Sequence, residues 1–124
     1  MGNPFSEMDS DEAMNQLFLK NAVALGRDMK PASGRRGGST DMANVSHYFP
    51  TIHPMLGIGD GSPQMHSPDF ADFAAGPKAD RALIDAALAM AYTAADFAAD
   101  EVQRRRLLAR IPLPTSGAGS ELDN

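Results

Sequence analysis

Apolar residues recur at helical spacing near the beginning of the chain. This pattern predicts a helix over residues 11–27 that packs on an apolar surface. The residues on its apolar face are Met14, Leu17, Phe18, Asn21 and Leu25. Ser10 is a suitable N-cap, and Asp11 places negative charge at the positive end of the helix dipole. Gly26 and then Pro31 end the helix.

A longer apolar periodicity follows in the last third of the chain. It predicts a single helix over residues 78–110, ended by Pro112. The apolar stripe consists of Leu83, Ala87, Met90, Ala94 and Phe97. Because most of these side chains are alanine or methionine, we expect the helix to approach its neighbour closely while burying little surface per residue.

The middle of the chain predicts one strand. Residues 51–58 are partly β-branched and apolar, and they lie between Pro50 and the turn sequence Gly-Asp-Gly at 59–61. This pattern is typical of a buried strand, although Pro54 favours the edge of a sheet, because proline cannot donate to a ladder.

Two short helices are expected on either side of this strand. Asp41 is a candidate cap for a helix that extends to Tyr48. The second helix has Ser67 as its cap, Pro68 at its first position and Asp69 in its first turn, which is a strong start signal.

These elements predict an α/β fold in which one or two strands are packed by the two main helices. An isolated pair of strands is marginally stable, so we expect the strands to belong to a larger sheet and the lone chain to be loosely folded. Residues 1–10 are interpreted as an N-terminal extension, and residues 11–111 as one unit. Residues 112–124 are rich in Gly, Ser and Pro, and a disordered tail is predicted.

Composition narrows the function classes. The 124 residues suffice for one domain, but an aromatic content of 6% predicts a thin core. The net charge of −5 disfavours nucleic-acid binding, which needs a basic face. The absence of cysteine excludes disulfides and thiolate metal sites. We expect no membrane span, because no apolar run approaches ~20 residues, and we predict a cytoplasmic protein.

Candidate chemistry concentrates between residues 37 and 73, where all three histidines lie. The glycines at 37–38 precede a helix start, where backbone amides can hold an anion; the alternative, which spacing alone favours, is a simple turn. His66 lies beside a capped helix start and could bind a metal, although a lone histidine is more often a hydrogen-bonded loop residue. His47 and His53 are interpreted as structural.

A nucleophilic serine is disfavoured. Neither Ser39 nor Ser67 has a base at a recognisable spacing.

Three segments together resemble a known enzyme family. They are Gly-Ser-Thr-Asp-Met-Ala-Asn-Val-Ser at 38–46, Pro-Thr-Ile-His-Pro at 50–54 and Met-His-Ser-Pro-Asp-Phe at 65–70, followed by an alanine-rich helix. In this order the chain is similar to the C-terminal part of the zinc-dependent amidohydrolases of peptidase family M-twenty, in their amidohydrolase branch. The resemblance covers roughly residues 11–97, and it implies that residues 11–111 are the C-terminal part of a catalytic domain.

The resemblance implies roles for particular residues. His66 matches the last metal ligand of the family. Gly38, Ser39 and Thr40 match the loop beside the substrate carboxylate, and Asp41 matches a recurrent acidic position whose role is interpreted as helix capping. For a complete member, it implies hydrolysis of N-acyl amino acids or small peptides. Two divalent metal ions, expected to be zinc, activate a water molecule, and a glutamate takes its proton. A complete member is expected to be a homodimer.

The remaining parts of the family site have no counterpart in this sequence. These parts are a histidine with a bridging aspartate on an early strand, a Glu-Glu pair and the inserted dimerisation domain. We therefore expect the chain alone to be inactive and to require the N-terminal part of the catalytic domain as its partner. The alternative is a non-enzymatic helical interaction module, or the remnant of a truncated gene.

Overall fold

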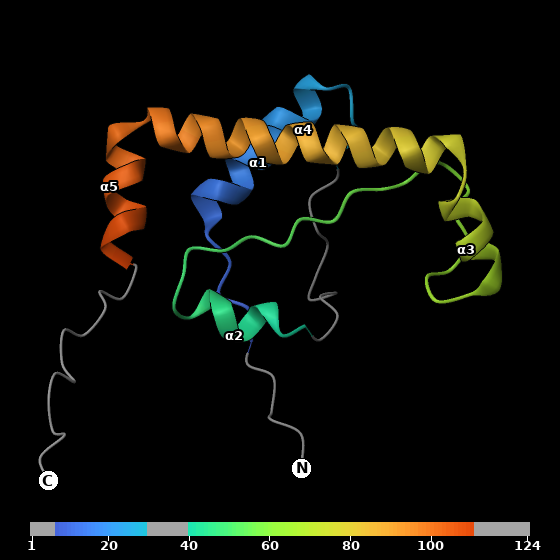
Figure 1. The fold of residues 1–124 in the computed structure, drawn as a ribbon, viewed down its shortest axis with the longest axis horizontal. Coiled ribbons are helices and arrows are strands. Elements are labelled where there is room, and N and C mark those ends of the chain that lie inside the picture. The colour runs from blue at the N-terminus through green and yellow to red at the C-terminus, as the bar shows by residue number, and fades with distance from the viewer. Residues whose placement is uncertain (1–6, 30–39, 111–124) are drawn as a thin grey trace, which may run out of the picture.

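The computed structural model describes residues 7–29 and 40–110, which fold as helices joined by extended connections (Figure 1). The helices are α1 (Glu12–Ala24), α2 (Met42–Ser46), α3 (Pro68–Ala74), α4 (Pro77–Ala99) and α5 (Glu101–Arg110). The longest helix, α4, is the axis of the fold, with α1 packed against it and α3 and α5 at its two ends (Figure 1). The predicted tail at 112–124 lies outside the described residues.

The α/β prediction is wrong for the described residues, which contain helices and no strand. Residues 51–58 are extended, and their burial alternates as in a strand: Ile52 and Leu56 pack on the core, whereas His53 and Met55 are exposed. No backbone–backbone hydrogen bond joins residues 52–58 to another described residue. The segment is not a strand because a strand requires a hydrogen-bonded neighbour, and the described chain provides none.

The prediction for α1 is confirmed on its buried face but not at its cap. Phe18 and Asn21 are buried as expected. The N-cap is Asp11 and not Ser10, since the Asp11 carboxylate accepts a hydrogen bond of 3.0 Å from the Met14 amide. Gly26 follows the helix with a φ of 83°, a left-handed conformation that favours glycine.

The apolar stripe predicted for α4 is not the face that packs on α1. The buried residues of α4 are Ala79, Ala82, Asp85, Ala89, Thr93 and Phe97. Of the predicted stripe only Phe97 is buried, while Leu83 is 68% exposed and Met90 is 53% exposed. The inner face tolerates polar residues because α1 and the turn after it supply partners for Asp85 and Thr93, and a buried polar group with a partner costs little.

The single helix predicted over residues 78–110 is broken at Asp100. This residue is extended, with φ −83° and ψ 109°. Its carboxylate accepts a hydrogen bond of 3.0 Å from the Gln103 amide, as an N-cap does. Arg104 then donates to the Ala98 carbonyl at the end of α4 at 2.7 Å. The chain therefore turns between α4 and α5 (Figure 1).

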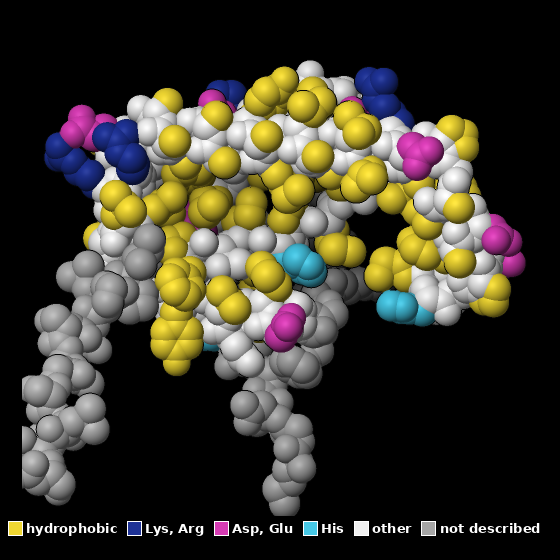
Figure 2. Space-filling model, in the orientation of Figure 1, with side chains coloured by type: hydrophobic (Ala, Val, Ile, Leu, Met, Phe, Trp, Pro, Cys, Tyr) yellow, Lys and Arg dark blue, Asp and Glu magenta, His cyan; other side chains and the backbone are white. Residues whose placement is uncertain are grey.

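The hydrophobic core is small, as the low aromatic content predicts. Its fully buried centre is Phe18, Ala22 and Ala89. Side chains that follow the C-terminus of α1 and side chains of the extended segment pack around this centre; they are Leu25, Met29, Ile52 and Leu56. Much apolar surface remains outside it, and Figure 2 shows hydrophobic side chains along α4 and below it.

By length and composition alone, α4 is also the one helix in residues 7–29 and 40–110 that could cross a membrane. The expectation that no segment reaches this length was therefore too strong. The inner face of α4 carries Asp85 and Thr93 in contact with α1 and its C-terminal turn, and 28% of the apolar window of α4 is buried. The cytoplasmic location stays a prediction.

Candidate functional site

His66 is presented to solvent by the loop that leads into α3. Its side chain is exposed, and the residue has a φ of 68°, the one positive φ outside glycine among the described residues. Ser67 caps α3 as predicted, with its hydroxyl accepting a hydrogen bond of 3.2 Å from the Phe70 amide. The imidazole therefore stands at a rigid helix start, on a backbone conformation that is uncommon for residues other than glycine.

The described residues do not form a complete metal site around His66. They contain no group of three or more His, Asp or Glu side chains arranged to hold a metal ion. A catalytic zinc ion normally needs three protein ligands and a bound water. Figure 2 shows the histidine side chains on this face well apart from one another. The role of His66 as a metal ligand stays a prediction.

The predicted substrate loop is only partly described. Gly38 and Ser39 lie outside the described residues. Thr40 is half-buried, and its hydroxyl accepts a hydrogen bond of 3.3 Å from the Met42 amide at the start of α2. Asp41 makes no side-chain cap bond, so the expected capping role belongs to Thr40. A contact between Thr40 and a substrate carboxylate stays a prediction.

His47 and His53 do not join His66. The Nε2 atom of His47 lies 2.8 Å from the Glu7 carbonyl, a contact that ties the N-terminal segment to α2. The same segment is held where the Asp9 amide donates to the Ser46 hydroxyl at 2.9 Å. His53 is exposed on the extended segment.

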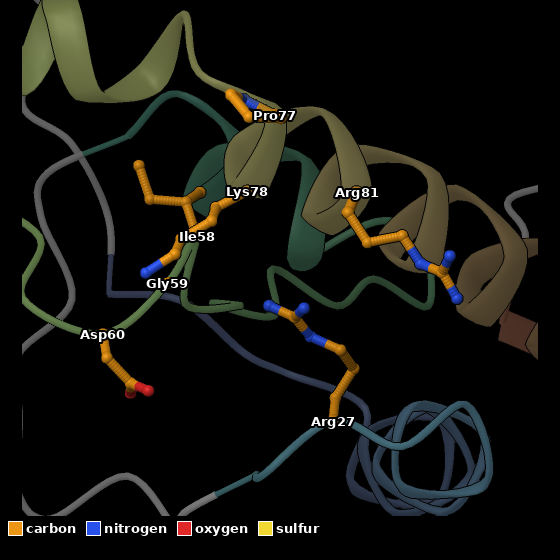
Figure 3. A pocket seen from close by; sticks show the side chains of 7 residues that line it. All are labelled: Arg27, Ile58, Gly59, Asp60, Pro77, Lys78 and Arg81. Carbon is orange, nitrogen blue, oxygen red and sulfur yellow. The ribbon is translucent and has the colours of Figure 1, made fainter.

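The sequence did not predict a cavity of about 400 Å³ between the turn after α1 and the first turn of α4 (Figure 3). Its lining residues are Arg27, Ile58, Gly59, Asp60, Pro77, Lys78 and Arg81. The glycines at Gly26 and in the Gly-Asp-Gly run indicated turns in the sequence. They did not show that these two turns lie next to each other and border the same cavity.

Asp85 organises one wall of this cavity. It is 4% exposed and pairs with two arginines: Arg27 Nη1 lies 3.5 Å from Oδ2, and Arg81 Nε donates to Oδ1 at 3.1 Å. Arg27 also donates to the Gly57 carbonyl of the extended segment. A single buried carboxylate thus connects the end of α1, the extended segment and α4.

A second ion pair closes the other end of the molecule. Arg106 of α5 donates to Asp11, and its guanidinium lies 5.9 Å from the centre of the Phe97 ring. The pKa of Arg106 is raised above its ordinary value by the hydrogen bond to Asp11 and by the charge of this carboxylate, which outweigh burial. The pair joins α5 to the start of α1, at the opposite end of α4 from α3 (Figure 1).

Comparisons of the chain with protein family models, curated proteins and solved structures found no match. The family resemblance therefore rests on the motifs of the sequence.

Proposed function

We propose that this chain supplies one metal ligand, His66, to a metal-dependent amidohydrolase that cleaves N-acyl amino acids or small peptides. The main support is the conformation of His66. Backbone strain at a non-glycine residue is commonly found at functional sites, and here it presents an exposed imidazole. The order of the Gly-Ser-Thr-Asp and His-Ser-Pro motifs adds to this support.

The other metal ligands and the general base would come from a polypeptide that carries the rest of the catalytic domain. The extended segment offers it a docking edge, since the backbone groups of residues 52–58 have no backbone partner among the described residues. The exposed residues His53 and Met55 lie on the outer side of this segment. Because the ligand set within the described residues is incomplete, the chain alone should not hydrolyse amides.

Complementation tests this function. The chain is co-expressed with a polypeptide that carries a His-x-Asp strand and a Glu-Glu pair, and hydrolysis of N-acetyl amino acids is measured in the presence of zinc. We expect activity only from the pair, and its loss in the His66→Ala variant. His53→Ala is the matched control, because it removes another exposed histidine and should retain activity. Full activity of the His66→Ala pair would exclude this role.

A second candidate function is that of a helical interaction module, and the outer face of α4 favours it. Leu83 and Ile84 are 68% and 56% exposed, although a monomeric protein rarely exposes a row of such side chains. If this face binds a protein partner, Leu83→Lys should abolish the complex. It should leave the zinc-dependent hydrolysis of the complemented pair unchanged. If Leu83→Lys instead reduces hydrolysis and leaves binding of the protein partner unchanged, the amidohydrolase function is favoured over the interaction module.

A further inference from the structure

The cavity of Figure 3 gathers positive charge in a chain whose net charge is −5. Arg27, Lys78 and Arg81 line it. Among the described residues, the only acidic one in its lining is Asp60, and Asp85 pairs with the two arginines. Three cations and two carboxylates leave a local charge of +1. An excess positive charge in a concave site favours anionic ligands.

Lys78 carries the charge that is most available to a ligand. Within residues 7–29 and 40–110, no carboxylate forms an ion pair with its ammonium group. Its stem lies over Gly59, where an added Cβ would be 3.2 Å from Cδ of the lysine. Gly59 has a φ of 145°, a backbone conformation that favours glycine, and an added Cβ would crowd the lysine stem. Packing, and not a counter-ion, therefore places Lys78 beside the cavity.

Arg27 is oriented toward the same space from the other side (Figure 3). Its contacts with Asp85 and with the Gly57 carbonyl fix the guanidinium, whose side chain is 20% exposed. A guanidinium has five N–H donors, and these two contacts leave donors for a ligand. Arg81 points away from the cavity along α4, so it contributes mainly through the electrostatic field of its positive charge (Figure 3).

The start of α4 adds to this field. The helix has 23 residues, and its N-cap Gly76 provides no side chain to the first turn. The partial positive charge of this helix N-terminus favours a nearby anion, and Asp80 in the first turn already supplies one negative charge. Pro77 and Ile58 supply apolar walls. The volume of about 400 Å³ lies within the range of roughly 300–1,000 Å³ that is typical of small-molecule sites.

We infer that this cavity binds a small organic anion through its carboxylate or phosphate group. Lys78 and Arg27 are the charged contacts, and Ile58 and Pro77 face the apolar part of the ligand. This site needs neither His66 nor a metal. Its test is therefore independent of the proposed amidohydrolase function.

An NMR titration of the full chain tests this site. Inorganic phosphate and butyrate are added separately at constant ionic strength, and backbone amide shifts are followed. We expect saturable shifts at Gly59 and Lys78, with a weakening of affinity of about tenfold in Lys78→Ala, since charge-assisted hydrogen bonds are lost. Lys20→Ala is the matched control, because it removes an equal charge from the exposed surface of α1 and should bind as the parent does.

A second variant tests the site without changing Lys78. Asp60→Asn removes the acidic residue from the lining and should tighten binding of the same anion. The anion that binds with the higher affinity identifies the head group that the site prefers. Absence of saturation with both anions would overturn the inference. Equal weakening in Lys20→Ala and Lys78→Ala, or weaker binding in Asp60→Asn, would overturn it as well.

Discussion

Arg106 and Asp11 are 95 positions apart in the sequence and form a two-pronged ion pair, with Nη1 2.6 Å from Oδ2 and Nη2 3.0 Å from Oδ1. The same carboxylate caps α1 by accepting from the Met14 amide. Asp11 is almost completely buried, whereas the Arg106 side chain is 38% exposed. One carboxylate therefore both starts the first helix and holds the last one.

Replacing Asp11 should destabilise the chain more than replacing Arg106. Asp11→Ala removes the cap and the ion pair together, and we expect a loss of about 2–3 kcal/mol in the free energy of unfolding. Arg106→Ala should cost less, because Asp11 keeps its bond to the Met14 amide and the arginine is partly solvated. Urea unfolding followed by circular dichroism measures both. An equal or smaller loss in Asp11→Ala would contradict the double role.

The contribution of Arg106 should not depend on pH in the neutral and mildly alkaline range. Its pKa is raised in the folded chain, so its stabilisation is complete below the pKa of the unfolded state and is lost only as the pH rises through the higher folded value. The difference in unfolding free energy between the parent and Arg106→Ala should thus be the same at about pH 7 and about pH 10. A steady decline over this interval would mean that another titrating group controls the pair.

The contact between α1 and α4 depends on a neutral amide at Asn21. Its Nδ2 donates to Thr93 Oγ1 at 3.2 Å and to Asp96 Oδ2 at 3.1 Å. Asn21→Asp places a second carboxylate beside Asp96 and should cost about 2 kcal/mol. Asp96→Asn in the same chain should recover at least about 0.5 kcal/mol, as a double-mutant cycle would show. Additive effects of the two changes would mean that these side chains do not interact.

Glycine should suit position 66 better than alanine, because the backbone there is left-handed. A left-handed conformation costs a residue with a Cβ roughly 1–2 kcal/mol, and a φ of 68° lies in this region. We therefore expect His66→Gly to be more stable than His66→Ala by about 1 kcal/mol in thermal or urea unfolding. In the complemented pair both variants should be inactive. Equal stabilities would argue against strain at this residue.

Local signals in the sequence predicted the elements that local interactions determine. Ser67, Pro68 and Asp69 start α3 as expected, because a cap acts within one turn. The apolar face of α1 was also predicted correctly, since Phe18 and Asn21 are buried. The extended conformation of residues 51–58 followed from their composition, but pairing depends on a neighbour that composition cannot supply.

Elements that depend on distant contacts were missed. The inner face of α4 contains Asp85 and Thr93, which look like solvent-facing residues until α1 provides their partners. Asp100 resembled one more exposed charge in a long helix, yet it caps α5. Arg27 and Lys78 line one cavity only because α1 and α4 pack together, so their shared site could not be read from spacing.

Zinc content is the most direct measure of the proposed role of His66. Metal analysis by plasma mass spectrometry is applied to the chain alone, to the complemented pair and to the pair with His66→Ala. We predict little zinc in the chain alone, stoichiometric zinc in the pair and a clear loss in the variant, because one histidine cannot hold the ion without the other ligands. Tight stoichiometric zinc binding by the chain alone, or unchanged zinc in the His66→Ala pair, would contradict this account.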